Sequence, residues 1–262
     1  MALHERKTRW FVGVAHRRAG KTVADINELI RGAFDCQLDS PRFAYIAPYL
    51  NQAKDIAWSY LKEYTAFIPG RRVNEGELWV ELPGGPRIRI YGADNPDRLR
   101  GIYLDGVVLD EFGDMDPGLW VNVIRPALAD RKGWACFIGT PKGKNAFHRI
   151  WTDAKDDPTW TRLELKASES GLLDAEELEA ARKDMDKDTY EQEFECSFEA
   201  AVKGAYYGDL MMTAVLRILR GTDILDKYPT LKAYRERCEA RPVFQRALAA
   251  HLADFQANKP AA

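Results

Sequence analysis

The chain has 262 residues, 46% of them hydrophobic and 30% charged, as is typical of a soluble protein with one or two globular domains. No apolar run approaches the roughly 20 residues that span a membrane, the N-terminus lacks a signal-peptide core, and the scattered cysteines and histidines form no metal-binding pair. With a formal net charge of −2 at pH 7, binding to nucleic acid would have to rest on local basic patches. A cytoplasmic protein with reduced thiols is expected.

The first predicted elements are a strand, a loop and a helix. The apolar run Trp10-Phe-Val-Gly-Val14 predicts the strand, and Val23-Ala-Asp-Ile-Asn-Glu-Leu-Ile30 predicts the helix. Between them, Gly20-Lys-Thr22 has the context of a phosphate-binding loop, in which backbone N–H groups and a helix N-terminus favour bound anions. The residues expected to surround a nucleotide are Ala15, His16, Arg17, Arg18, Ala19, Gly20, Lys21 and Thr22.

Two residues of this loop have expected roles in nucleotide chemistry. Lys21 would reach the β and γ phosphates, and the Thr22 hydroxyl would bind Mg²⁺. The usual pattern opens with glycine, whereas this chain has Ala15, which does not adopt a positive φ cheaply. A chance occurrence of Gly-Lys-Thr in a loop is the alternative interpretation.

The following segments alternate between strand and helix patterns. Phe43-Ala-Tyr-Ile-Ala47 predicts a strand and residues 52–67 predict a helix. Residues 77–82 and 87–91 alternate in residue type around Pro83-Gly-Gly-Pro86, which predicts a β-hairpin.

A second motif lies further along the chain, in Gly106-Val-Val-Leu-Asp-Glu111. Its apolar run predicts a strand buried on both faces, as in the centre of a parallel sheet, and ligands bind at the carboxyl ends of such strands. Asp110 would hold Mg²⁺, directly or through water, and Glu111 would orient and deprotonate the attacking water. A strand followed by a solvated acidic turn is the alternative for this motif alone, but both motifs in this order favour a nucleotide site.

The remaining predicted elements complete an α/β pattern. Residues 134–138 and 161–165 predict two further strands, and the alternation of strands with helices predicts an α/β layer fold with a mainly parallel sheet. Asp174 begins a helix, with Glu177 as the partner of a capping box, and residues 174–199 are expected to be largely helical.

Residues 4 to 208 resemble the ATPase domain of the large subunit of tailed-phage terminases, the motors that package DNA into procapsids. The resemblance rests on several segments in family order, which are His16-Arg-Arg-Ala-Gly-Lys-Thr22, Ala47-Pro-Tyr-Leu-Asn-Gln-Ala53, Leu99-Arg-Gly101, Val107-Val-Leu-Asp-Glu-Phe112, Ile124-Arg-Pro-Ala127, Phe137-Ile-Gly-Thr-Pro-Lys-Gly143 and Tyr190-Glu-Gln-Glu-Phe-Glu-Cys-Ser-Phe198. It implies a P-loop NTPase fold of the RecA/ASCE type, with a mainly parallel sheet flanked by helices, and ATP and Mg²⁺ as cofactors. The implied partners are double-stranded DNA, a portal protein, a small terminase subunit and other copies of the chain in a ring, in the cytoplasm of a bacterial host cell.

The resemblance also implies roles for three further sites. Arg17 would act in cis on the γ-phosphate as an arginine finger, and Thr140 would sense the γ-phosphate and relay hydrolysis to motion. Arg98 or Arg100 could contact phosphate or DNA. A solvent-facing arginine, an ordinary strand exit and a surface loop are the respective alternatives.

The chain departs from the family at both ends. Nothing before Thr8 supplies the glutamine that reads the adenine base in these proteins, and the pattern ends near Gly208. Residues 209–262 form a predicted all-helical tail, with helices over 209–219, 231–238 and 242–252, and residues 209–258 resemble the C-terminal helices of bacterial glutathione transferases. DNA cleavage is therefore not predicted, and transferase activity is not carried over.

Three functions remain open from the sequence. The first is an ATP-hydrolysing DNA-packaging motor domain, and the second is a non-catalytic fusion remnant that folds and binds nucleotide or partners without turnover. A glutathione-transferase-like protein is the third. The retained Lys21, Thr22, Asp110 and Glu111 favour the first over the second.

Overall fold

The computed structural model describes residues 2–200, 212–213, 215–219, 224–241 and 244–246. Contacts along the backbone divide the chain into two compact units, residues 1–201 and 202–262. The sequence boundary near residue 208 lies in the undescribed segment 201–211.

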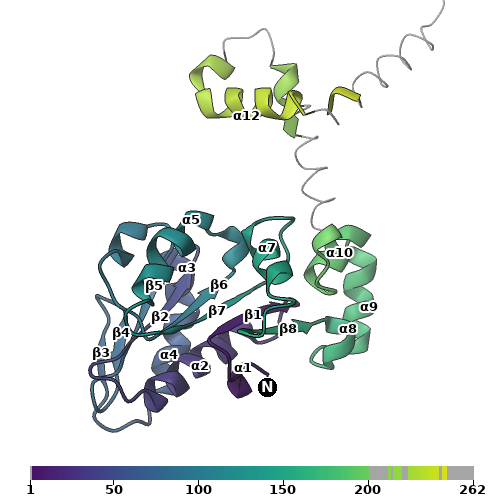
Figure 1. Cartoon of the computed structure of the whole chain (residues 1–262). Helices are drawn as coiled ribbons and strands as arrows, with labels where there is room; N and C mark the ends of the chain where they lie inside the picture. Colours follow the sequence, from purple (N-terminus) through teal and green to yellow (C-terminus); the bar gives the residue numbers. More distant parts are fainter. Residues whose placement is uncertain (1, 201–211, 214, 220–223, 242–243, 247–262) are drawn as a thin grey trace, which may run out of the picture. The chain divides into compact units, whose positions relative to one another are not determined.

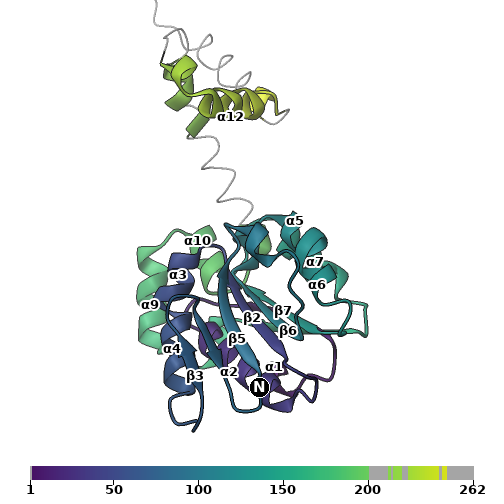
Figure 2. The ribbon, with the colours of Figure 1, turned by 90° about the vertical axis from the view of Figure 1, so that its left-hand side faces the viewer.

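The first unit is built on one eight-stranded sheet in the order β3-β4-β5-β2-β6-β7-β1-β8. The strands are β1 Trp10–Ala15, β2 Arg42–Ala47, β3 Arg72–Asn74, β4 Trp79–Glu81, β5 Arg87–Gly92, β6 Gly106–Asp110, β7 Trp134–Gly139 and β8 Trp160–Leu165. From β5 to β8 every neighbouring pair is parallel, whereas β3 and β4 continue the sheet antiparallel beyond β5. The mainly parallel sheet expected from the sequence is confirmed, and Figure 2 shows β5, β2, β6 and β7 side by side.

Helices flank both faces of this sheet. They are α1 Ala2–Glu5, α2 Lys21–Asp35, α3 Leu50–Asp55, α4 Ala57–Tyr64, α5 Pro117–Leu119, α6 Arg125–Ala127, α7 Ala146–Asp153, α8 Ala167–Ser170, α9 Ala175–Asp184 and α10 Lys187–Glu193. A π-helical turn, Trp120–Ile124, joins α5 to α6, and short 3-10 helices span Pro96–Leu99 and Phe112–Asp114. In Figure 1, α2 and α4 lie on one side of the sheet and α5 and α7 on the other.

Two apolar cores hold these three layers together. On one face, side chains of α2 such as Ile26 and Leu29 pack with Trp58 of α4 against the sheet. On the other face, Phe112 and Phe147 pack against β1, β6 and β7. Because β1 and β6 are covered from both sides, all of their residues are buried, which is why apolar runs marked them in the sequence.

The structure differs from the expected elements in three places. The helix expected over 52–67 is interrupted at Ile56 and ends at Tyr64. Asp174 caps α9 as expected, but the helix stops at Asp184, because Asp186 accepts a hydrogen bond from the Thr189 N–H and starts α10. The hairpin of β4 and β5 is confirmed, and the short, exposed strand β3 was not predicted.

The second unit contains α12, Pro229–Glu239, preceded by a 3-10 helix, Leu225–Lys227. The helix expected over 231–238 lies within α12. Those expected over 209–219 and 242–252 fall partly outside the described residues, so the glutathione-transferase resemblance stays a prediction. In the part of the chain that the structure describes, no helix has both the length and the apolar character that crossing a bilayer requires.

Candidate active site

The phosphate-binding loop lies between the end of β1 and the start of α2. Arg18 and Gly20 take left-handed backbone conformations, with φ of 63° and 73°, and turn the chain so that α2 begins at Lys21. Ala15 is the last residue of β1 and is buried. Alanine at the opening position therefore causes no backbone strain, since the positive φ angles occur later in the loop.

Lys21 lies folded over this loop, with its side chain mostly buried. Its Nζ donates to the backbone oxygens of Ala15 and His16, at 3.3 and 3.4 Å, and lies 3.6 Å from Oε1 of Glu111. The ammonium group is thus held between the loop and the carboxylate at the end of β6. This position suits a cation that contacts phosphate oxygens.

Asp110 is the buried last residue of β6, and its carboxylate is held at two points. The Tyr45 hydroxyl donates to one oxygen, and the Glu111 N–H donates to the other at 2.9 Å. Burial and, next, the charge of Glu111 raise the pKa of Asp110 to about 6, while the Tyr45 hydrogen bond opposes the rise. A divalent cation would favour the ionised carboxylate.

Glu111 follows Asp110 with φ of 50°, in the left-handed region. Such a conformation costs a non-glycine residue about 1 kcal/mol or more and tends to occur at functional sites. The carboxylate is fixed from the neighbouring strand, because Thr140 Oγ1 and the Thr140 N–H donate to Oε2 at 3.2 and 3.4 Å. The strained turn and these contacts aim Glu111 at the loop rather than along the strand.

These groups line one cavity of about 430 Å³ at the carboxyl ends of the strands. The expected residues that line it are Arg18, Ala19, Gly20, Lys21, Thr22, Asp110 and Glu111. Its other walls, which the sequence did not predict, come from Val23, from the end of β2 and from α3 to α4, namely Tyr45, Ala47, Pro48, Gln52, Ala53, Ile56 and Tyr60.

The remaining expected residues lie beside this cavity. His16 is buried, with Nδ1 2.6 Å from the Arg17 carbonyl oxygen and Nε2 3.0 Å from Ser170 Oγ, and burial lowers its pKa. The Arg17 side chain is 69% exposed, and its guanidinium lies 3.7 Å from Glu193 on α10. Thr140 acts on the cavity through Glu111. The finger role of Arg17 therefore stays a prediction that requires the side chain to turn away from Glu193.

Arg98 and Arg100 do not line the nucleotide cavity. Arg100 pairs with Asp97 at 3.1 Å, and both side chains are exposed. Arg98 lines a separate small cavity beside β5.

One buried acid next to this site, Asp25, was not predicted from the sequence. Asp25 of α2 is 0% exposed, and within the described residues neither of its carboxylate oxygens has a hydrogen-bond partner. Burial, followed by the charge of Asp110, raises its pKa well above the ordinary value. The available signal was spacing, since Asp25 lies four residues after Lys21 and so on the same side of the helix.

The oxygen atoms of this site suit magnesium. The Thr22 hydroxyl and the Asp110 carboxylate supply hard oxygen ligands, which Mg²⁺ prefers. No cluster of three or more His, Cys, Asp or Glu side chains suited to a metal occurs among the described residues. Few protein ligands are what a magnesium ion shared with phosphates needs.

Comparison with known proteins agrees with this geometry. Residues 13–211 match the family described as terminase large subunit, T4likevirus-type, N-terminal. The terminase large subunit of Thermus phage G20c is 43% identical over 77 residues, which are 28% of this chain and 16% of that protein. That of Escherichia phage T5 is 26% identical over 205 residues, which are 75% of this chain and 45% of that protein. The chain therefore spans less than half the length of these relatives.

Solved structures share the fold. The large terminase ATPase domain of Thermus phage P74-26 superposes with a TM-score of 0.64 at 23% identity, over 75% of this chain and 91% of that one. The large terminase of another thermophilic bacteriophage, in complex with ADP, gives a TM-score of 0.64 at 18% identity, over 75% and 52% of the two chains. The family match covers most of the first unit, including the loop, Asp110 and Glu111, and the chain belongs to the terminase large subunit family of the T4likevirus type, in its N-terminal part.

Proposed function

We propose that this chain is the ATPase domain of a DNA-packaging motor, which hydrolyses ATP to drive translocation of duplex DNA. The observation that carries the proposal is the cavity in which the loop, Lys21, Asp110 and Glu111 converge, with Glu111 aimed by Thr140. A terminase of the same fold has been solved with ADP and another time with ATP-γ-S. A non-catalytic remnant would have no need for the strained backbone of Glu111 or for the two Thr140 donors that hold its carboxylate.

Each residue has a role in in-line attack of water on the γ-phosphate. Backbone N–H groups of the loop and Lys21 bind the phosphates, and the Thr22 hydroxyl and Asp110 would hold Mg²⁺, which neutralises phosphate charge when bound. Glu111 accepts the proton of the attacking water, and the Thr140 hydroxyl keeps its carboxylate in place. Arg17 adds positive charge at the γ-phosphate once it leaves Glu193.

The partners follow from the motor role. Duplex DNA would be the translocated substrate, gripped mainly through its phosphates. A portal protein, a small terminase subunit and further copies of this chain in a ring complete the proposed motor.

Magnesium-dependent ATP hydrolysis by the purified chain, with and without duplex DNA, tests the proposal. Turnover should vanish in Lys21→Ala, and Glu111→Gln should bind nucleotide but turn over at least about 10²-fold more slowly, as expected for loss of a general base. Thr152→Val, on the exposed surface of α7, is the control variant. A well-folded wild-type chain that binds nucleotide without turnover would instead establish the non-catalytic remnant.

A further inference from the structure

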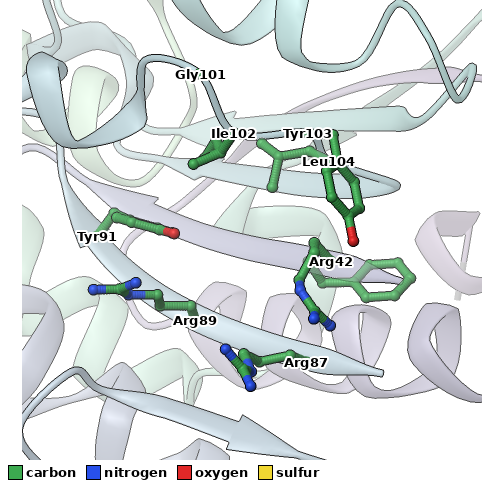
Figure 3. A pocket seen from close by; sticks show the side chains of 9 residues that line it. Arg42, Arg87, Arg89, Tyr91, Gly101, Ile102, Tyr103 and Leu104 are labelled. Atoms are coloured by element: carbon green, nitrogen blue, oxygen red, sulfur yellow. The ribbon is translucent and has the colours of Figure 1, made fainter. Parts of the chain in front are cut away.

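A second cavity, which we name the arginine pocket, lies between the β2–β5 strand pair and residues 101–104 (Figure 3). Its volume is about 270 Å³. The residues that line it are Arg42, Phe43, Arg87, Arg89, Tyr91, Gly101, Ile102, Tyr103 and Leu104. Three of these side chains are guanidinium groups, and none of the described residues that line the pocket is a carboxylate, so the pocket favours an anion.

The strand register brings the arginines together. Arg42 of β2 is paired directly with Arg87 of β5, and Arg89 is paired with Ala44. Because side chains alternate between the faces of a strand, all three arginines lie on the face opposite α2, together with Tyr91. Like charges placed directly opposite each other destabilise a sheet. An anion bound between the strands would relieve this repulsion.

Internal partners neutralise only part of this charge. Arg87 pairs with Glu81 on β4 at 2.7 Å, but Glu81 also pairs with Arg72, so one carboxylate serves two guanidinium groups. Among the described residues, Nη1 of Arg42 donates to two backbone oxygens, those of Pro41 and Gly85, at 3.2 and 3.1 Å, and to no carboxylate.

Arg89 is only partly satisfied by its neighbours in the pocket. Its Nε is buried without a hydrogen-bond partner in the described part of the chain, and its guanidinium lies 5.0 Å from the centre of the Tyr91 ring. A buried donor left unpaired is costly, and a fork of N–H groups suits the oxygens of phosphate.

The arginine pocket is separate from the nucleotide cavity. Arg42 begins β2, and Ala47 at its other end lines the nucleotide cavity. The two residues are five steps apart along the extended strand, a distance of about 17 Å. The anion bound here is therefore a different group from the phosphates of the hydrolysed nucleotide.

We propose that the arginine pocket binds a phosphate group, and that in the packaging motor this group belongs to the backbone of duplex DNA. The identity of the DNA rests on the proposed function, whereas the phosphate chemistry rests on the pocket alone. A free phosphate is the other source of the same chemistry. An acidic protein segment is a different kind of occupant.

The first experiment measures binding of a fluorescent duplex to the full chain by anisotropy over a series of salt concentrations, without nucleotide. The double variant Arg42→Gln/Arg89→Gln should bind more weakly for every sequence tested, and the slope of log affinity against log salt should fall by about 1, for the one phosphate contact that is lost. The matched control is Arg182→Gln/Lys183→Gln, which removes the same charge from exposed positions on α9. Its salt slope should stay near that of the wild type.

The second experiment measures the melting temperature in inorganic phosphate. The wild-type chain should gain more than the double variant, which must melt cooperatively to count as folded. If phosphate raises the melting temperature of the wild type more than that of the double variant, but both bind DNA equally, the pocket binds free phosphate and the proposed contact with DNA is wrong. Equal behaviour of wild type and double variant in both experiments would overturn the proposal and leave an acidic protein segment as the candidate occupant. Neither measurement depends on ATP hydrolysis. A chain without ATPase activity would therefore refute the proposed function and leave the phosphate-binding proposal for the arginine pocket still to be tested by these two experiments.

Discussion

Replacing Asp25 by asparagine should make the stability of the first unit, relative to the wild type, rise with pH. The carboxyl group is fully buried and unpartnered within the described residues, and burial raises its pKa well above the ordinary value. Above the unfolded-state pKa of about 3.9, the folded chain therefore holds a proton that the unfolded chain has released. The contribution of Asp25 to the free energy of unfolding then falls by about 1.4 kcal/mol for each pH unit until the folded-state pKa is reached.

Asparagine cannot ionise, so in the Asp25→Asn variant this position contributes nothing to the pH dependence of the free energy of unfolding. Asp110, whose pKa is raised to about 6, interacts electrostatically with Asp25, so the two proteins are compared below about pH 6, where Asp110 stays largely protonated in the folded chain. Between about pH 5 and about pH 6 the stability of Asp25→Asn relative to wild type should rise by about 1.4 kcal/mol, while the unpaired amide subtracts a constant of about 1–3 kcal/mol.

Urea unfolding followed by tryptophan fluorescence, at several pH values, measures both quantities. The slope rather than the absolute difference decides the matter, because the amide cost does not depend on pH. A difference that stays constant across this range would mean that Asp25 is ionised in the folded chain, and the assignment of a buried, protonated acid would be wrong.

Three further variants test individual contacts. Thr140→Val removes the 3.2 Å hydrogen bond to Glu111 and should lower turnover about tenfold with little change in nucleotide affinity, as steady-state hydrolysis and nucleotide titration would show. Gly106→Ala should lower the free energy of unfolding by about 1–3 kcal/mol, since an added Cβ would lie within 3.0 Å of the Trp134 ring. Arg17→Ala should slow turnover about 10³-fold if its guanidinium acts on the γ-phosphate, yet leave stability within about 1 kcal/mol in urea unfolding, because its ion pair is exposed.

Each of these variants has a matched control. Thr152→Val loses a hydroxyl whose bond goes to the His148 carbonyl, so unchanged turnover is expected. Gly76→Ala adds a Cβ that meets only Asn74 at 3.5 Å, so stability should hold. Glu193→Ala frees Arg17, and slower turnover in that variant would contradict a finger released from Glu193.

The parallel strands were predictable from the sequence because buried strands consist largely of apolar residues. β1 and β6 are covered on both faces, so every position is apolar or small until the motif begins. β3 escaped prediction because it has only three residues, of which Arg72 and Val73 are exposed and Asn74 is half-buried, so it shows no buried apolar run; it is a strand through its pairing with β4. The break between α9 and α10 was missed because Asp186 resembles any other charged residue of a polar helix until its capping bond is seen.

Site residues that belong to a short sequence motif could be predicted. Site residues that only the folded chain brings to the cavity could not. Lys21, Thr22, Asp110 and Glu111 belong to two motifs, and their convergence followed from the carboxyl ends of parallel strands. Tyr45, by contrast, is an aromatic residue of a kind common in strands, so the sequence does not mark it as a site residue. The register of β2 against β6 brings its hydroxyl to Asp110.

The strand β2 has one end in each of the two cavities. Arg42 at its start lines the arginine pocket, and Tyr45 and Ala47 towards its end line the nucleotide cavity. Hydrogen bonds to β5 on one side and β6 on the other keep the strand extended, so it changes length very little. β2 thus connects the two cavities by an extended strand about 17 Å long. Because β2 is hydrogen-bonded to β5 and β6, any displacement of its Arg42 end would reach Tyr45 and Ala47 only together with these neighbouring strands.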